Sequence, residues 1–255
     1  MIKLFDHPGL RPPLQGGEFI PWDIYSARVL AAYCSYYDMQ ECQFWVQDHP
    51  GPAGHPSTGG ELSAAISLVD GFAVLAAKES ADWEELVAFL TMQPWSRLQC
   101  DAETAEKLPF PVEWRSMLLR FAAPKKELAQ ENITAANDPG VVYDILTRCG
   151  LGAKNRNEWM ADLALRWRRG TAQTWLLNDV CTGSAMAVTP GHVYIGALGT
   201  LPEHRGRGLA GRLVAHICGQ YAGREIRLSC REELRGFYEN IGFERVGEMS
   251  TMGKL

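Results

Sequence analysis

The clearest hydrophobic periodicity of the chain lies in residues 208–221. Apolar side chains recur there at three- and four-residue spacing, and Arg212, His216 and Gln220 occupy the opposite stripe. This pattern predicts an amphipathic helix. Directly after it, residues 225–230 alternate apolar and polar side chains, which predicts a half-buried strand.

Turn residues and weaker patterns complete the second half. Pro190-Gly191 is a turn dipeptide between two apolar segments and predicts a hairpin, while Gly242 follows a helical pattern where a C-terminal cap belongs. The predicted order is β-α-α-β-β-β-α-β-α-β. Its strands are residues 128–135, 171–177, 184–189, 192–200, 225–230 and 243–252, and its helices are residues 139–149, 157–169, 208–221 and 232–241.

The first half repeats much of this order. Asp70-Gly71 is a strong hairpin signal, and Asp82 with Glu85 forms a capping-box pattern before a helix. The predicted strands are residues 42–47, 62–69, 72–77, 97–100 and 112–121, and the predicted helices are residues 22–37, 82–92 and 102–108. We therefore predict a mixed-sheet α/β fold of two similar domains, residues 1–122 and 123–255, with a mobile Gly/Pro-rich loop at residues 48–60.

Composition narrows the class of protein. The 255 residues are 46% hydrophobic and 22% charged, which is typical of a folded chain with a sizeable core. We find no apolar stretch long enough to cross a bilayer and no apolar segment typical of a secretion signal near residue 1, so we expect a cytoplasmic protein without a membrane partner. The seven cysteines are scattered without a C-x-x-C pair, which predicts reduced thiols and no metal site.

Charge is distributed unevenly along the chain. Residues 1–120 carry 8 Lys and Arg against 16 Asp and Glu, whereas residues 121–255 carry 17 against 14. The net charges of −8 and +3 place an anionic ligand on the second half. No nucleic-acid partner is expected.

The segment with the most distinctive chemistry is Leu198–Leu213, LGTLPEHRGRGLAGRL. It joins a strand end, a short loop and a glycine-spaced helix start. The first amides of a helix have no intrahelical partner and lie at the positive end of the helix dipole, so they bind anions. Here they belong to Gly206, Arg207, Gly208, Leu209 and Ala210, and Arg205 adds formal charge beside them. The sequence thus predicts a phosphate or pyrophosphate site.

A dinucleotide-binding fold is one alternative for this segment. Gly206-x-Gly208-x-x-Gly211 matches its fingerprint, and Glu232 lies where a ribose-binding acid would be expected. However, only 44 residues follow Gly211, too few for a second half of that fold, and residues 201–205 separate the strand from the glycines. A nicotinamide-dependent oxidoreductase is therefore the least favoured of the three functions that we consider for this chain.

Two motifs resemble those of the GCN5-related N-acetyltransferase (GNAT) family. Arg205-Gly-Arg-Gly208-Leu-Ala210 follows an apolar strand and a proline, as in the acetyl-CoA signature of that family. Phe237-Tyr238-Glu-Asn-Ile-Gly242-Phe243 resembles its second signature, an aromatic-Tyr pair that closes a helix. The resemblance covers about residues 125–255.

This resemblance implies acetyl-CoA as cosubstrate and no metal. Its pyrophosphate would lie on the amides of Gly206–Gly211, and its pantetheine arm would run along Leu198, Gly199 and Thr200 like an added strand. A bulge near Gly196 and Gly199 would open the slot between strands. In many relatives an Asn stands seven residues before the Tyr, but Arg231 stands here, and we consider it a candidate phosphate contact.

The reaction implied is direct attack of a primary amine on the acetyl thioester. Backbone N–H groups of Leu198–Thr200 would polarise the carbonyl, and Tyr238 would protonate the departing thiolate. The predicted strand 192–200 lacks the carboxylate that many relatives use as the base, so the choice stays open among His192, Tyr194, His204, Glu203 and a water chain.

The first half lacks the glycine-rich loop. At its corresponding helix start stand Asp82, Glu84 and Glu85, which stabilise the helix and repel a pyrophosphate. We therefore expect at most one CoA site, in the second half. The acidic first half would either cover the acceptor site or serve as a packing surface. As a cover, it would favour a cationic small-molecule or protein amine. As a packing surface, it could form the interface of a homodimer. The alternative function is a non-catalytic acyl-CoA-binding module.

Overall fold

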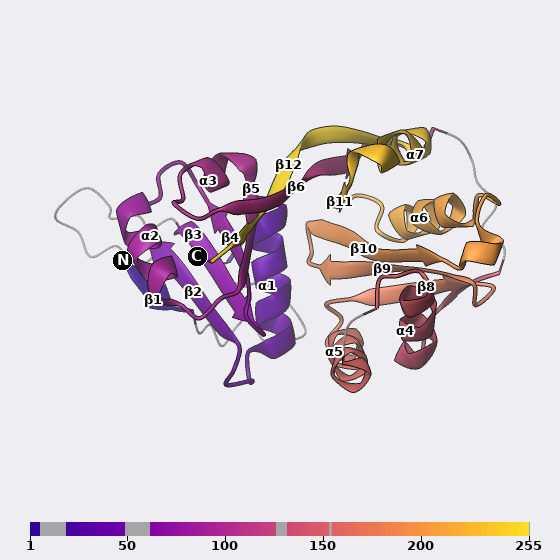
Figure 1. Ribbon diagram of the computed structural model, residues 1–255, viewed down its shortest axis with the longest axis horizontal. Coiled ribbons are helices and arrows are strands. Elements are labelled where there is room, and N and C mark those ends of the chain that lie inside the picture. The colour runs from indigo at the N-terminus through magenta and orange to yellow at the C-terminus, as the bar shows by residue number, and fades with distance from the viewer. Residues whose placement is uncertain (6–18, 49–61, 126–131, 153–154, 255) are drawn as a thin grey trace. The chain divides into compact units, whose positions relative to one another are not determined.

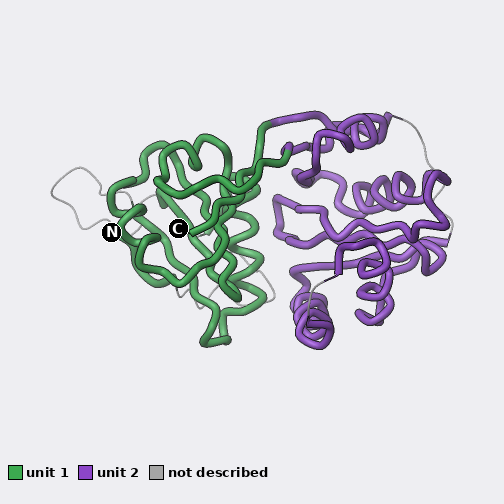
Figure 2. The backbone as a smooth tube through the Cα atoms, in the orientation of Figure 1, with its two compact units in different colours: residues 1–116, 247–255 green, residues 117–246 purple. Residues whose placement is uncertain are grey.

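A computed structural model of the chain describes residues 1–5, 19–48, 62–125, 132–152 and 155–254 (Figure 1). The chain forms two compact units (Figure 2). Unit 1 comprises residues 1–116 and 247–255, and unit 2 comprises residues 117–246. Among the described residues, no helix has both the length and the apolar character needed to span a membrane.

Unit 1 is a mixed sheet with the strand order β1-β2-β3-β4-β5-β12. β4 and β5 are parallel and joined through α2, whereas the other neighbours are antiparallel. The predicted hairpin turn is confirmed, since Asp70 and Gly71 both have positive φ, 49° and 72°. The elements are β1 (Ile2–Leu4), α1 (Ile24–Tyr36), β2 (Gln43–Asp48), β3 (Leu62–Val69), β4 (Phe72–Ala77), α2 (Trp83–Met92), β5 (Arg97–Asp101), α3 (Ala102–Glu106) and parts of β6 (Val112–Phe121) and β12 (Phe243–Gly253).

Unit 2 repeats this pattern with the strand order β6-β11-β10-β9-β8-β7. β10 and β11 are parallel and joined through α6, just as β4 and β5 are joined through α2. The elements are β7 (Ile133–Ala135), α4 (Pro139–Arg148), α5 (Arg156–Arg168), β8 (Gln173–Leu177), β9 (Cys181–Val188), β10 (His192–Thr200), η2 (Pro202–His204), α6 (Leu209–Gln220), β11 (Glu225–Cys230), η3 (Glu232–Leu234) and α7 (Arg235–Ile241).

Helices cover both faces of the unit 2 sheet (Figure 1). The apolar stripe of α6, with Leu213, Val214 and Ile217, is fully buried against one face. On the other face, Leu146 of α4 and Leu163 of α5 belong to a separate buried cluster. The binary pattern of α6 therefore predicted correctly which side of that helix faces the sheet.

The last strand of each half completes the sheet of the other half. Met249–Gly253 of β12 pair with Arg97–Asp101 of β5 in unit 1, and Met117–Arg120 of β6 pair with Arg227–Cys230 of β11 in unit 2. The units therefore differ from the expected domains, 1–122 and 123–255, chiefly because residues 247–255 pack in unit 1. Each half ends in a strand, β6 or β12, and chain order does not reveal which sheet each of these strands joins.

Most of the predicted secondary structure is confirmed, but β1 and η2 were not predicted. The expected helix 232–241 is a 3₁₀ turn, η3, followed by α7. The expected strand 128–135 is β7 at its C-terminal end, and residues 128–131 lie outside the described residues. Residues 49–60 of the predicted mobile loop also lie outside them.

Candidate functional site

β10 separates from β11 halfway along its length. The parallel pairing runs from His192 opposite Glu225 to Ile195 opposite Leu228 and ends there. Beyond this point, within the part of the chain that the structure describes, β10 pairs only with β9, with a register shift between Gly196 and Gly199. Ala197 has φ 49°, which marks the predicted bulge. The edge of β10 that faces β11 therefore has no strand partner among the described residues over its last residues, as an added extended chain requires, and we call this stretch the open edge.

The predicted residues Leu198, Gly199 and Thr200 all lie on this open part of β10. The side chain of Leu198 packs into the core beneath α6. A Cβ at Gly199 would lie 3.2 Å from Cys149 Sγ and 3.3 Å from Leu146 Cδ2 of the opposite helix layer. The strand thus offers its backbone at the edge while its side chains pack above and below.

The glycine-rich loop leads into an uncapped helix. Gly206 and Gly208 have φ values of +76° and +73°, in the left-handed region that favours glycine. α6 begins at Leu209, and no side chain of the described residues caps its N-terminus. Gly206 and Gly208 are exposed, with no atom within 4 Å of a Cβ placed on either. The amides of Leu209, Ala210 and Gly211 thus begin a helix whose positive end carries no capping side chain.

The two arginines of the loop support its backbone. Arg205 Nε donates to the Thr200 carbonyl at 3.1 Å, and Arg207 Nη2 donates to the Glu203 carbonyl at 3.4 Å. Both side chains are exposed, so each keeps N–H groups for an anion. Arg205 therefore connects the loop directly to the end of β10.

An ion pair connects the same loop to α4. Arg148 Nη2 lies 2.5 Å from Glu203 Oε1. The backbone N–H of Glu203 and then Arg148 lower the pKa of the Glu203 carboxyl, although burial opposes this shift. Glu203 is thus an ionised anchor of the loop, which weakens its candidacy as a general base.

Tyr238 is a buried phenol in α7, packed against aromatic rings. It is 7% exposed, and its ring centroid lies 4.9 Å from Phe237 and 5.8 Å from Phe243. Burial, with smaller contributions from Cys230 and Tyr194, raises the pKa of Tyr238. No hydrogen bond joins its hydroxyl to the described residues. Tyr238 is therefore a neutral O–H donor with no hydrogen-bond partner among the described residues.

The other candidates are spread around the open edge. Arg231 is exposed directly after β11, where its backbone begins η3. His192 is at the opposite end of β10 from the bulge, and His204 lies in η2 on the loop side. Tyr194 hydrogen-bonds to Ser229 of β11, with the two oxygens 2.6 Å apart. Sequence reasoning missed Ser229, since only the strand register brings it to Tyr194.

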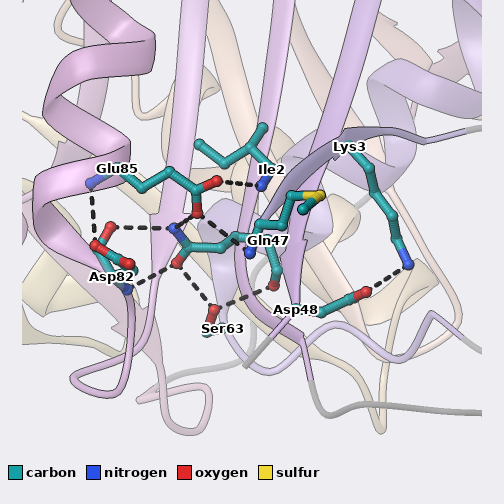
Figure 3. Close-up of polar contacts among 8 residues, drawn as sticks. Ile2, Lys3, Gln47, Asp48, Ser63, Asp82 and Glu85 are labelled. Carbon is teal, nitrogen blue, oxygen red and sulfur yellow. Dashed lines mark hydrogen bonds and ion pairs between the residues drawn. The ribbon is translucent and has the colours of Figure 1, made fainter. Parts of the chain in front are cut away.

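The corresponding helix start in unit 1 is occupied by the protein's own polar groups (Figure 3). Asp82 caps α2 by accepting from the Glu85 amide at 3.0 Å, as the sequence predicts. Glu85 does not complete the predicted capping box. It accepts hydrogen bonds instead from the Ile2 amide at 2.7 Å and from Gln47 Nε2 at 2.9 Å. Gln47 Oε1 in turn accepts a hydrogen bond from the Asp82 amide. These carboxylates place negative charge where unit 2 presents free amides.

A cavity of about 980 Å³ in unit 2 lies elsewhere. It is lined by the end of β6, the C-terminal part of α6 and the start of β11, including Phe121, Cys218 and Ile226. None of the predicted cofactor residues lines it. The candidate site is thus an open strand edge and helix start, at the other end of α6 from this cavity. Among the described residues, no cluster of three or more His, Cys, Asp or Glu side chains is placed to hold a metal ion.

Comparison with known proteins gives a family match for part of the chain. Residues 170–245, which contain β10, α6, β11 and α7, match the family model described as an acetyltransferase (GNAT) domain. The search of curated proteins found no match.

Solved structures with similar folds cover most of the chain. A GNAT-family acetyltransferase from Colwellia psychrerythraea shares 11% identity over 100% of both chains, with a TM-score of 0.55. A GNAT from Sphaerobacter thermophilus shares 17% identity over 90% of this chain and 87% of its own, with a TM-score of 0.53. A tandem GNAT protein from the clavulanic acid biosynthesis pathway shares 11% identity over 89% and 87%, with a TM-score of 0.54.

These findings confirm the expected mixed α/β fold and the expected resemblance to the GNAT family. Residues 170–245 match the GNAT family model, and the mixed α/β fold is shared with solved structures of GNAT acetyltransferases, one of them a tandem protein. The match of residues 170–245 to this family model supports acyl transfer as the chemistry of that part of the chain.

Proposed function

We propose that the chain transfers the acetyl group of acetyl-CoA to a primary amine by direct attack. The observation that carries this proposal is the open edge of β10 ending at an uncapped, glycine-opened helix start, with the unbonded hydroxyl of Tyr238 in the same unit. An extended pantetheine arm fits the open edge, and a diphosphate fits the free amides.

Each part of the site has a role in this reaction. Backbone N–H groups at Leu198–Thr200 would polarise the acetyl carbonyl, a type of contact worth about 2.7–4 kcal/mol in other enzymes. Gly206–Gly211 with Arg205 and Arg207 would hold the pyrophosphate, and Arg231 is a further candidate contact. Tyr238 would donate its proton to the departing sulfur, because burial keeps the phenol neutral.

For the acceptor amine, the proposal specifies only its charge. The negative charge of residues 1–120 favours a cationic small-molecule or protein amine. All seven cysteines are free thiols, which fits the proposed cytoplasmic setting. A single CoA site is proposed, because Asp82 and Glu85 occupy the equivalent helix start of unit 1.

A non-catalytic acyl-CoA-binding module is the second candidate, supported by the absence of any carboxylate from β10. Thiol release is followed while the full chain is incubated with acetyl-CoA and a panel of primary amines, and CoA affinity is measured by calorimetry. Release on at least one amine supports the enzyme. Tight CoA binding without release on any amine favours the module, and no CoA binding overturns both.

A further inference from the structure

Tyr194 and Ser229 join β10 and β11 at the point where the strands separate. Tyr194 is one residue before the last paired residue of β10, and Ser229 is the first residue of β11 beyond that pairing. Their hydroxyl oxygens lie 2.6 Å apart, and either hydroxyl can be the donor. The pair therefore spans the inner end of the open edge.

The pair lies on the sheet face opposite α6. Val193 and Ile195 of β10 belong to the core beneath α6, so the alternation of the strand turns Tyr194 to the other face. Leu228 and Cys230 belong to the same core, which places Ser229 likewise. Tyr238 lies in that core, on the α6 side. Two phenols thus lie on opposite faces of the sheet, and Tyr194 makes a small contribution to the raised pKa of Tyr238.

The strands around this pair carry few carboxylates. Strands β8, β9 and β10 contain none. The one carboxylate of β11, Glu225, lies 2.6 Å from the guanidinium of Arg227 in an ion pair. On α5, Asp162 lies 3.8 Å from Arg166. On β10 and β11, the Tyr194–Ser229 pair is thus a neutral hydrogen-bonding route at the point where the strands separate.

We propose that the Tyr194–Ser229 pair receives and relays the proton of the acceptor amine. This inference rests on the proposed function. As the C–N bond forms and the C–S bond breaks, the nitrogen proton passes to the Tyr194 oxygen, the Tyr194 proton passes to Ser229, and the Ser229 proton passes to water. The sulfur takes the C–S electron pair and a proton from Tyr238, which regains one from water. Proton release and thiol protonation thus occur on opposite faces of the sheet.

The test compares Tyr194→Phe, Ser229→Ala and the double variant with wild type, using the best amine of the panel. The matched control is Ser184→Ala, which breaks another hydroxyl pair of unit 2, Thr174–Ser184 at 2.7 Å, within a fully paired part of the sheet. We expect a loss of roughly 100-fold in kcat/KM for the amine in each single variant, the lower end of acid–base effects. Acetyl-CoA affinity should stay within about threefold, because the backbone contacts remain.

Two readouts separate a relay from a packing role. The double variant should lose little more than the worse single variant, because the two hydroxyls act as one unit. Added imidazole should restore part of the rate of Tyr194→Phe and leave wild type and Ser184→Ala unchanged, since an external base can replace a relay but cannot repair packing.

The outcomes also separate this inference from the proposed function. Undiminished transfer by Tyr194→Phe, or a loss shared equally by Ser184→Ala, overturns the relay and leaves acetyl transfer intact. A large loss without imidazole rescue, or fully additive losses, also overturns it. Wild-type protein that binds no CoA, or that acetylates no amine, overturns the proposed function and the relay with it.

Discussion

Met252 of β12 lies opposite Leu98 of β5 in the antiparallel ladder, and both side chains are fully buried in the core of unit 1. The strand that follows the Tyr238 helix in sequence therefore stabilises the other half of the chain. Through this exchange, the stability of unit 1 depends on residues that the chain supplies only after the whole of unit 2.

We expect Met252→Ala to destabilise unit 1 selectively. Truncating a fully buried Met to Ala costs about 2–5 kcal/mol of unfolding free energy, because it leaves a cavity. Hydrogen exchange should show faster opening of β5 and β4 than of β8 and β9. Met92, 83% exposed, gives the control Met92→Ala, for which a change within about 0.5 kcal/mol is expected. Uniform loss of protection in both units would contradict the exchange of strands.

Gly208→Glu should abolish most CoA binding. The substitution strains a backbone at φ +73° and adds a carboxylate beside the free amides of α6. Gly223→Glu is the matched control, because Gly223 also has a positive φ, +87°, and open space around it, yet lies beyond the other end of α6. Calorimetry should show at least a tenfold loss of CoA affinity only for Gly208→Glu. Equal affinities would exclude the loop as the pyrophosphate site.

Tyr238→Phe should lower turnover by roughly ten- to a hundredfold with CoA affinity nearly unchanged. The ring stays in its aromatic cluster, and no hydrogen bond to the described residues is lost, so the thermal midpoint should hardly move. Phe237→Leu, which alters the same ring cluster without touching the hydroxyl, serves as the packing control. Full activity of Tyr238→Phe would show that Tyr238 only packs in the core and that its hydroxyl has no catalytic role.

Glu85→Gln should make the unfolding free energy of unit 1 depend less steeply on pH in the acid range. Although burial opposes it, hydrogen bonds from Ile2 and Gln47 lower the pKa of Glu85 below its ordinary value. A carboxyl with a lowered folded-state pKa adds stability above its unfolded pKa, about 4.3, and loses that stability as pH falls through the folded value. Denaturant unfolding between about pH 2 and 6 measures this slope.

Glu84→Gln removes the same charge from the same turn of α2, and Glu84 is exposed. It should leave the slope close to that of wild type. An unchanged slope in Glu85→Gln would show that the polar cluster of Figure 3 does not hold this carboxylate in its ionised form.

Gly242→Ala should destabilise unit 2 and displace Tyr238. A Cβ at Gly242 would lie 1.9 Å from the Ala123 carbonyl oxygen, and its φ of +125° is unfavourable for alanine. We expect a loss of at least about 1–3 kcal/mol, the cost of such backbone strain. Gly236→Ala, at an open position of the same helix, should be neutral or slightly stabilising. Thermal unfolding of the two variants checks the contrast.

The sequence by itself determined the local elements and the phosphate-type loop. Helix and strand periods, Asp70-Gly71, the uncapped glycines before α6 and the Phe237-Tyr238 pair act through neighbouring residues, so their meaning can be read without distant contacts. The bulge in β10 was also foreseeable, because Gly196 and Gly199 are poorly suited to a regular strand.

Only the tertiary structure decided which strand completes which sheet, and which side chains meet at the strand separation. β6 pairs with β11 and β12 pairs with β5, and these partners lie far apart in the sequence, so the choice depends on long-range packing. Ser229 reaches Tyr194, and Glu85 leaves its expected cap for Ile2 and Gln47, because strand register sets those distances. Register is a property of the assembled sheet, and no local pattern encodes it alone.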